Sequence, residues 1–219
     1  PAPVGITHHR MTEKKQDEIK VVVFDLNGTF YNKSSKEEFF KFIGKKKPHK
    51  LAYYFQMVYY KALLKLNQIR MTEFKENFFN YLDNIPPEQV EKYAREFWKE
   101  EYPNEFNKEV KAKLDRYRQE GVQVICATGA LEVYVKPLFE LYPIDAVFGT
   151  QTRYNGETYI VEGKACKDEE KIKRLDKHFK GKPYQIVEAF SDAKEDILDH
   201  AKKAWLIKDS GKLVPYTES

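Results

Sequence analysis

The sequence predicts an α/β fold: a mostly parallel sheet with helices on both faces, plus an inserted all-helical domain. Three observations predict it. Short apolar, β-branched runs recur along the chain, helical patterns separate them, and one long stretch after the first run contains no strand pattern. Strands that alternate with helices are joined by right-handed crossovers, and such connections produce a parallel sheet.

The first apolar run covers residues 19–24 (IKVVVF) and is typical of a strand that is buried on both faces. Similar runs predict further strands at 122–127, 146–148, 185–190 and 204–207. Helical patterns lie between them at 105–120, 131–141, 168–179 and 194–203. Residues 150–161 break this alternation and predict a β-hairpin, because Asn155-Gly156 separates two short strand patterns.

The same patterns divide the chain into a discontinuous core domain, residues 11–32 and 105–219, and a helical domain, residues 33–104. Residues 1–10 (PAPVGITHHR) precede Met11 and are expected to be an extension or cloning remnant outside the fold. The first 20 residues contain no apolar stretch of signal-peptide length, and no window reaches the ~20 apolar residues that span a bilayer. A cytoplasmic protein is therefore expected.

The amino-acid composition excludes several classes of protein. With 219 residues, 42% of them hydrophobic and 15% aromatic, the chain is neither a disordered tail nor a collagen-like rod. The chain has two cysteines, which lie 40 residues apart and match no metal-ligand spacing. This disfavours a small secreted protein that is stabilised by disulfides. A net charge of +4 is too small to predict a nucleic-acid partner.

Asp25 is the first candidate functional residue, because it stands where the first predicted strand ends and the Gly-containing turn Asn27-Gly28 begins. In a parallel sheet, ligands bind in the crevice beyond the carboxyl ends of the strands. Alternatively, Asn27-Gly28 forms a hairpin turn and Asp25 has no function. The residues that follow pass into a helical pattern rather than a returning strand, which favours the functional interpretation.

Thr128 and Gly129 also follow a predicted strand, at the expected start of a helix. A hydroxyl together with free helix-start amides can hold an anion. The alternative is that Thr128 is an ordinary N-cap.

Asp192 and Asp196 lie four residues apart after another predicted strand, close enough for one hard cation to bind both. The alternative makes Asp192 an N-cap and Glu195 the partner in a capping box, and both interpretations are compatible. Lys171, near the start of a helix, is the candidate cation for a bound phosphate, and Lys164 is its competitor. The alternative is that either lysine is one of the 38 basic residues and is merely solvated.

With these motifs in place, the sequence resembles the haloacid dehalogenase (HAD) superfamily of phosphohydrolases. The matching segments are DLNGT at 25–29, ATGA around Thr128, CKDEEKIKRL around Lys171 and SDAKED at 191–196. The helical insertion resembles the C1 cap of the phosphoserine-phosphatase-like branch. Residues 190–207 and the basic, apolar cap are also similar to those of phosphatidylglycerophosphatase C.

The resemblance implies a Rossmann-like fold and Mg²⁺-dependent hydrolysis of phosphate monoesters through an aspartyl-phosphate on Asp25. A carboxylate and a phosphate dianion repel each other, so the attack requires a cation that neutralises both. The implied metal ligands are Asp25, the backbone carbonyl of Asn27, and Asp192, with Asp196 binding directly or through water. The residues implied in holding the phosphoryl group are Leu26, Asn27, Gly28, Thr128, Gly129 and Lys171.

Asn27 departs from the family motif, which normally reads Asp-x-Asp. The second Asp protonates the leaving alcohol and then activates water, and an amide cannot exchange a proton in this way. Either the change is engineered and stalls turnover, or it is natural and the chemistry is slow or different. A catalytically weak protein of this fold that binds a phosphate or a metabolite is therefore the alternative function.

The insertion holds 14 basic and 10 acidic residues, so it accounts for the whole net charge, and it contains 16 of the 32 aromatic residues. Residues 51–66 have only Gln56, Lys61 and Lys65 as clearly polar positions, which favours the central helix of a small bundle. The alternative is an interfacial helix on an anionic membrane, with the lysines at 45–50 attracting lipid. The expected substrate is a small phosphorylated metabolite or a phospholipid headgroup. Nucleic acid is disfavoured, because the basic residues are interleaved with a nearly all-apolar helix.

Overall fold

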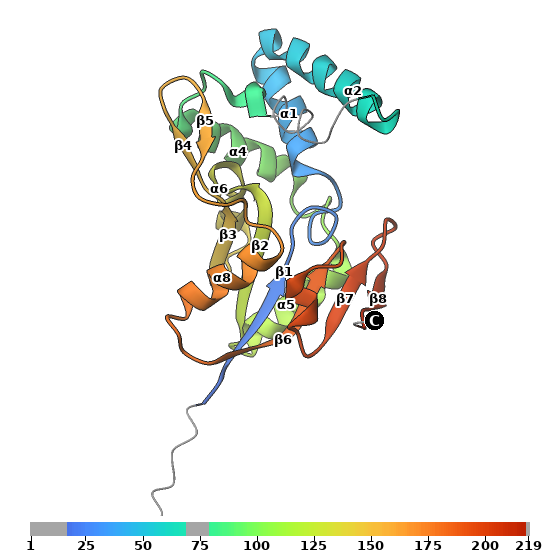
Figure 1. The fold of residues 1–219 in the computed structure, drawn as a ribbon, viewed down its shortest axis with the longest axis vertical. Helices are drawn as coiled ribbons and strands as arrows, with labels where there is room; N and C mark the ends of the chain where they lie inside the picture. Colours follow the sequence, from blue (N-terminus) through green and yellow to red (C-terminus); the bar gives the residue numbers. More distant parts are fainter. Residues whose placement is uncertain (1–16, 69–78, 218–219) are drawn as a thin grey trace, which may run out of the picture.

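A six-stranded sheet forms the centre of the protein in this computed structural model, which describes residues 17–68 and 79–217 (Figure 1). The strand order is β3-β2-β1-β6-β7-β8. The strands are β1 (Ile19–Phe24), β2 (Gln123–Leu131), β3 (Ala146–Thr150), β6 (Tyr184–Ser191), β7 (Ala204–Ile207) and β8 (Leu213–Pro215). All neighbours are parallel except β7 and β8, so the predicted α/β fold with a mostly parallel sheet is confirmed. The expected extension at residues 1–10 lies outside the described residues.

The register of β1 positions the candidate site. Phe24, the last residue of β1, pairs with Cys126 of β2 on one side and with Phe190 of β6 on the other. Because the three strands are parallel, the segments that follow these residues emerge at the same edge of the sheet. Asp25 therefore lies between the chain at 127–128 and the chain at 191–192.

Side chains of β1 alternate between two hydrophobic clusters, one on each face of the sheet. Val22 and Phe24 belong to the first cluster, and Val21 and Val23 belong to the second. Helix α5 (Lys108–Gln119) contributes to the first cluster, as do the short helices α6 (Glu132–Val135) and α7 (Leu138–Leu141). Helices α8 (Glu169–His178) and α9 (Asp196–Asp199) contribute to the second, so helices cover both faces as predicted.

Two of the predicted elements differ from the structure, and one strand was not predicted. The single helix expected at 131–141 is two short helices, because Pro137 interrupts the run and cannot donate a backbone hydrogen bond. The helix expected at 194–203 is only the four-residue α9. Strand β8 was not predicted, because its three residues (LVP) are too few to show a period.

The predicted β-hairpin is present as a separate two-stranded sheet, β4 (Thr152–Tyr154) and β5 (Tyr159–Val161). Its connection is four residues long rather than two. Asn155 closes it, because its side-chain Oδ1 accepts hydrogen bonds from the backbone N–H groups of Glu157 (2.9 Å) and Thr158 (2.8 Å).

The regular secondary structure of the insertion between β1 and β2 is helical wherever the structure describes it. Its elements are α1 (Ser35–Lys46), η1 (Pro48–Lys50), α2 (Leu51–Lys65), η2 (Phe79–Leu82) and α4 (Pro87–Glu101), and the described part of 33–104 contains no strand. Figure 1 shows this insertion beyond the carboxyl end of β1. It therefore lies on the same side of the molecule as the candidate site.

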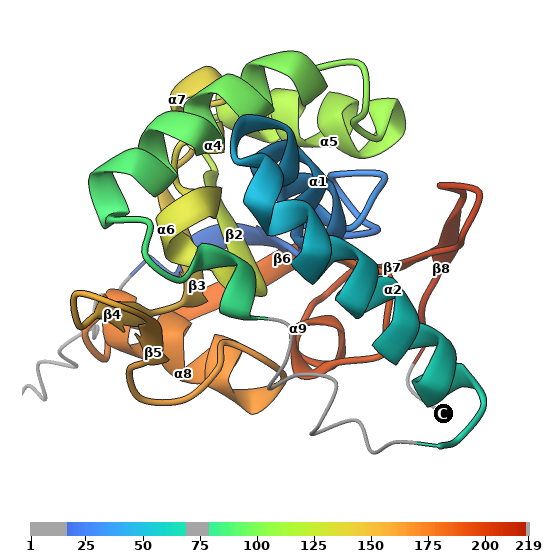
Figure 2. The same cartoon turned by 90° about the horizontal axis from the view of Figure 1, so that it is seen from above.

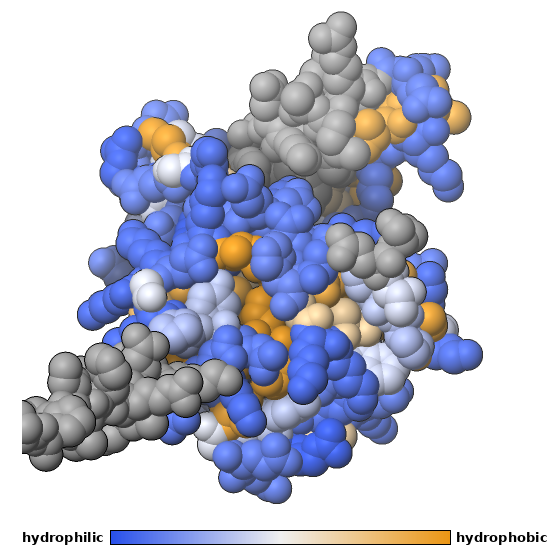
Figure 3. Space-filling view, turned by 60° about the horizontal axis from the view of Figure 1, so that its bottom comes forward, coloured by the Kyte–Doolittle hydropathy of each residue, from blue (hydrophilic) through white to orange (hydrophobic). Residues whose placement is uncertain are grey.

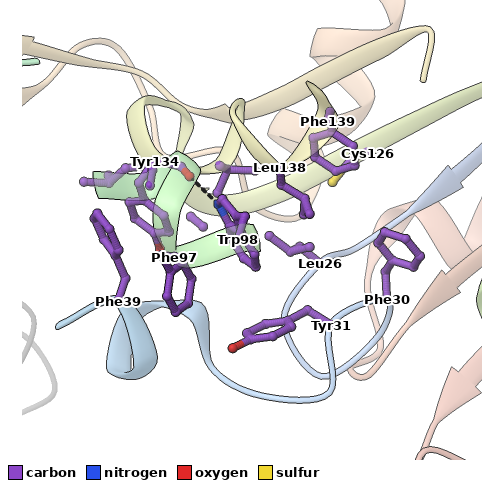
Figure 4. Close-up of a cluster of buried hydrophobic side chains, with 14 of the residues drawn as sticks. Leu26, Phe30, Tyr31, Phe39, Phe97, Trp98, Cys126, Tyr134, Leu138 and Phe139 are labelled. Carbon is purple, nitrogen blue, oxygen red and sulfur yellow. Dashed lines mark hydrogen bonds between the residues drawn. The ribbon is translucent and has the colours of Figure 1, made fainter. Parts of the chain in front are cut away.

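The inner half of the insertion shares one hydrophobic core with the sheet. Phe39 of α1 and Trp98 of α4 pack with Tyr134 of α6, as Figure 4 shows, and all three belong to the first cluster together with β1. The rings of Phe39 and Tyr134 are stacked with centroids 5.1 Å apart. Helices α1 and α4 therefore have no hydrophobic core that is separate from that of the sheet. The boundaries at 33 and 104 mark where the secondary structure becomes helical, but they do not separate two cores. The division into two domains stays a prediction.

Helix α2 is not the central helix of a bundle, and that expectation is wrong. Of its fifteen residues only Met57 is buried. Figures 1 and 2 both show α2 on the outside of the molecule, with its C-terminal end extending away from the sheet. None of the helices in the described parts of the chain is long and apolar enough to cross a membrane.

Replacing Trp98 by Ala is expected to lower the free energy of unfolding by about 3–5 kcal/mol, the usual cost of removing a large buried ring. Trp98 is 0% exposed, and its indole Nε1–H donates a hydrogen bond to the Tyr134 carbonyl (2.7 Å). Trp98→Phe retains most of the volume but leaves that carbonyl unpaired, so a loss of about 1–3 kcal/mol is expected. Urea unfolding measures both losses. A loss below about 1 kcal/mol for Trp98→Ala would contradict the shared core.

Candidate active site

A cleft of about 320 Å³ opens at the carboxyl edge of the sheet, where β1, β2 and β6 end. Six of the residues that the sequence motifs predict line this one cleft: Asp25, Asn27, Thr128, Gly129, Lys171 and Asp192. They come from four segments that are distant in sequence. The remaining lining residues were not predicted: Lys36, Ala130, Lys167, Asp168 and Glu195.

Asp25 is fixed by the backbone on both sides of it. Its N–H donates to the Phe190 carbonyl of β6 (2.9 Å), and its Oδ1 accepts a hydrogen bond from the Leu26 N–H (2.8 Å). Burial raises the pKa of the Asp25 carboxyl, and the Asp192 carboxylate raises it further, whereas Lys171 acts in the opposite direction. The structure therefore holds a carboxylate in a position where its charge is costly without a cation.

Lys171 is the buried cation of this cleft. It lies in the first turn of α8, is only 3% exposed, and its Nζ is 3.4 Å from Asp25 Oδ1 and 2.8 Å from Glu195 Oε1. Burial lowers the pKa of its ammonium, but the carboxylates of Asp25 and Glu195 more than offset this and raise the pKa above its usual value. Lys171 is therefore positively charged and within reach of the nucleophile candidate. Lys164 lies elsewhere, in a separate pocket beside Arg174.

Asp192 follows β6 and lies against the turn after β1. Gly28 has a φ of +70°, and a Cβ at this position would lie 2.5 Å from Asp192 Oδ2. Glycine is therefore required twice over, by its backbone angle and by the close approach of the carboxylate. Gly28 and the fully buried Leu26 do not line the cleft, and Gly28 lines a separate pocket beside Lys208.

Thr128 occupies a strand rather than the start of a helix, so the expected helix N-terminus at this position is absent. Strand β2 continues to Leu131, which pairs with Thr150 of β3 after an irregularity in the register. Thr128 is 1% exposed, and its Oγ1 accepts a hydrogen bond from the Ala130 N–H (3.1 Å). The N-cap interpretation is therefore wrong, although Thr128 still lines the cleft.

Asn27 joins the first motif to the insertion. Its Oδ1 accepts a hydrogen bond from the backbone N–H of Ser35, the first residue of α1 (3.0 Å). Because α1 has no side-chain cap from Ser34, Asn27 supplies an acceptor that the helix N-terminus would otherwise lack.

Asp196 and Glu195 differ in where they lie. Asp196 begins α9 and does not line the cleft, whereas Glu195 does. Glu195 is itself the N-cap residue of α9, so it does not complete a capping box for Asp192. The Ser191 hydroxyl donates to Glu195 Oε2 (2.6 Å), and Lys171 lies at its other oxygen.

The unpredicted residues had signals of different strength. Glu195 stands inside the SDAKED motif, and Lys167 and Asp168 stand inside CKDEEK, so each adjoins a predicted residue. Lys167 lies against the backbone of Gly129, because a Cβ on that glycine would lie 2.9 Å from Lys167 Cε. Lys36, in the first turn of α1, had no signal, because it belongs to the insertion.

The residues present fit a hard divalent cation. Mg²⁺ binds through one or two carboxylates and keeps several waters, so it does not need a cage of protein ligands. No cage of three or more His, Cys, Asp or Glu side chains occurs in the part of the chain that the structure describes. Asp25 and Asp192 are two neighbouring carboxylates, and burial raises the pKa of both. A cation between them would remove the repulsion that contributes to the raised pKa of Asp25.

Known proteins include a family whose model matches this chain and solved structures with a similar fold. A family model described as haloacid dehalogenase-like hydrolase matches residues 22–198. No curated protein matches the chain. A protein of unknown function from Bordetella pertussis Tohama I has a TM-score of 0.62 at 12% identity, over 85% of this chain and 80% of that one. A phosphoserine phosphohydrolase-like protein from Francisella tularensis subsp. tularensis SCHU S4 has a TM-score of 0.58 at 20% identity, over 85% and 86%. A substrate-bound phosphoserine phosphatase has a TM-score of 0.57 at 17% identity, over 86% of both chains.

Proposed function

The chain belongs to the haloacid dehalogenase-like hydrolases, and from this premise we propose that it hydrolyses phosphate monoesters through an aspartyl-phosphate on Asp25. One observation carries the proposal. Asp25 lies in a cleft at the carboxyl edge of the sheet, with the buried Lys171 ammonium 3.4 Å from its Oδ1 and the Asp192 carboxylate beside it. A carboxylate flanked by a fixed cation and a candidate metal ligand is suited to attack phosphorus.

In the proposed reaction, a carboxylate oxygen of Asp25 forms a bond to phosphorus while the bond from phosphorus to the ester oxygen breaks. The alcohol leaves with a proton from water, and a second water later cleaves the aspartyl-phosphate to release phosphate and free Asp25. Lys171 offsets negative charge on the transferring group. Glu195 keeps the Lys171 ammonium in place, because it binds the same cation at 2.8 Å.

Asp25, Asp192 and the backbone carbonyl of Asn27 would hold Mg²⁺, as the donor chemistry of the cleft supports. When bound, the metal would neutralise charge on the phosphoryl group and on Asp25. Glu195 is not proposed as a ligand, because Lys171 and Ser191 already engage its two oxygens. Asp196 lies outside the cleft, so its proposed contribution is limited to contact through water.

The phosphoryl group is proposed to lie between Lys171 and the segment of Thr128 and Gly129. Lys167 lies against Gly129 and Lys36 reaches the cleft from α1, so both can meet further negative charge on the substrate. A cleft of about 320 Å³ suits a small phosphorylated metabolite or a phospholipid headgroup. Both remain proposed substrates.

Removal of divalent metal is expected to abolish hydrolysis of p-nitrophenyl phosphate, and added Mg²⁺ is expected to restore it. The assay uses wild type and the variant Asn27→Asp, which restores the Asp of the family motif and is expected to be more active. Calorimetric titration with Mg²⁺ provides a readout without turnover, in which Asp192→Asn should weaken binding at least tenfold. The matched control is Asp199→Asn, a change of an exposed acid in α9 outside the cleft. Hydrolysis that continues at the same rate in excess chelator would contradict the proposed metal.

A second candidate function is a phosphate- or metabolite-binding protein with little turnover, and Asn27 is the observation that favours it. This candidate predicts that inorganic phosphate with Mg²⁺ raises the melting temperature while no variant hydrolyses phosphate esters. The first candidate predicts the same stabilisation together with hydrolysis by Asn27→Asp.

A further inference from the structure

Helix α2 exposes an apolar face. Phe55 is 68% exposed, Tyr59 61% and Leu66, at the C-cap, 67%. Their spacing of four and seven residues places them on one side of the helix, together with Leu51 and Val58, which are also exposed. No charged residue interrupts this side. We call this set of five residues the α2 face.

The α2 face is unusual on this protein. Among the described residues, eight large hydrophobic side chains are exposed, and six of them belong to α2 or its C-cap. The other two, Ile160 and Val161, lie on β5. Figure 3 shows a surface that is mainly hydrophilic on the side it draws, with hydrophobic residues visible near its centre, at its upper left and at its upper right, where α2 lies. Exposed apolar residues that cluster in this way mark an interaction site more often than scattered ones do.

The opposite side of α2 holds the helix to the rest of the insertion. Met57 is buried, and the ring of Tyr54 packs edge-on against Phe40 of α1 with centroids 5.7 Å apart. At the start of the helix, Lys50 is 3% exposed and its Nζ donates to the Asp83 carbonyl (2.7 Å). These contacts fix which side of α2 faces outward.

Lysines flank both ends of the α2 face. Lys45 and Lys47 precede the helix, and Lys65 is in its last turn. In contrast to Lys46, which pairs with Glu96, and Lys61, which pairs with Glu37, these three have no ion pair within the described residues. The sequence contains no acid between Glu38 and Glu73. The surface around α2 is therefore apolar in the middle and positive at both ends.

We propose that α2 docks on an anionic lipid surface, with the α2 face in the headgroup boundary and Lys45, Lys47 and Lys65 against lipid phosphates. A helix with an apolar side and flanking cations is the arrangement that binds in the plane of such an interface. Each lysine near an acidic surface contributes about a fivefold gain in binding. This proposal does not rest on the proposed hydrolysis, because docking needs no residue of the cleft.

The positions of the lysines disfavour a second copy of the chain as the partner that covers the α2 face. Two α2 helices packed antiparallel would bring Lys45 and Lys47 of one copy next to Lys65 of the other. A parallel pair would bring identical lysines together. Either arrangement places like charges at both ends of the contact, whereas an anionic membrane supplies the opposite charge at both ends.

The test is co-sedimentation of the full chain with vesicles of phosphatidylcholine alone and of phosphatidylcholine mixed with phosphatidylglycerol. We expect binding to the anionic vesicles only, weakened by added salt. The double variant Phe55→Gln/Tyr59→Gln should lose about tenfold or more. Lys45→Gln/Lys65→Gln should lose about 25-fold, from two lysines at fivefold each.

Matched variants control for loss of hydrophobicity and of charge. The variant Ile160→Gln/Val161→Gln removes two exposed hydrophobic residues outside α2. The variant Lys92→Gln/Lys99→Gln removes two lysines of α4. Each of these two control variants should bind the vesicles as wild type does. All variants alter exposed side chains and should keep the wild-type melting temperature. Equal binding to both vesicle types, or unchanged binding by Phe55→Gln/Tyr59→Gln, overturns the proposal. So does concentration-dependent dimerisation that this variant abolishes, because it would identify a second copy as the occupant.

Discussion

Replacing Asn27 by Asp is expected to raise kcat/KM for p-nitrophenyl phosphate by roughly 10²–10⁴-fold, the usual contribution of a general acid and base. An amide can neither give a proton to the leaving oxygen nor take one from the attacking water, whereas a carboxyl group can do both. The structure indicates that the exchange is tolerated. Asn27 uses Oδ1 to accept the hydrogen bond from Ser35 N–H, and an Asp would accept the same bond with one oxygen and keep the other free.

Asn27→Ala is the matched control for this gain. It removes the acceptor for Ser35 N–H and introduces no carboxyl group, so activity should stay at or below that of wild type. Steady-state assays at fixed Mg²⁺ measure all three proteins. If Asn27→Asp is no more active than wild type, the phosphate-binding function is favoured over hydrolysis.

Replacing Asp25 by Asn in the Asn27→Asp background is expected to lower kcat by at least roughly 10⁴-fold, as removal of a nucleophile does in other hydrolases. The amide oxygen is a poor nucleophile, and Lys171 loses the carboxylate that lies 3.4 Å from its Nζ. Rapid acid quenching with ³²P-labelled substrate provides a second measurement. Label should be retained by the Asn27→Asp protein and be absent when Asp25 is also replaced.

Thermal unfolding distinguishes loss of chemistry from loss of fold in this variant. Burial raises the pKa of Asp25, which means that the ionised group is held at a cost in stability. Asp25→Asn removes this charge with little change in shape, and the Lys171 ammonium keeps the Glu195 carboxylate at 2.8 Å, so the melting temperature should change little. Retained hydrolysis by a folded Asp25→Asn protein would eliminate Asp25 as the nucleophile.

Local patterns were sufficient for most of the sheet. The apolar runs at 19–24 and 204–207 match β1 and β7 residue for residue, because a strand buried on both faces needs apolar side chains at nearly every position. The end of β2 was not predictable in the same way. Its last residues, 128–131, are held in strand geometry by the pairing of Leu131 with Thr150 of β3, a contact between distant segments.

Local patterns did not predict the position of helix α2. Its nearly all-apolar sequence favoured a buried position, yet only Met57 is buried. An apolar side chain favours burial, but it is buried only where another helix or strand packs against it. Whether α1 and α4 surround α2 or lie to one side is a property of the tertiary arrangement.

By itself, the sequence determined the α/β class, the helical insertion, and the strand ends at which Asp25 and Asp192 stand. These depend on patterns within about ten residues, and such patterns can be read locally. Only the tertiary structure decided that Glu195 rather than Asp196 lines the cleft, that Lys171 rather than Lys164 reaches Asp25, and that Lys36 joins them. Those outcomes depend on the register of β1 between β2 and β6 and on the path of the insertion, which long-range packing sets.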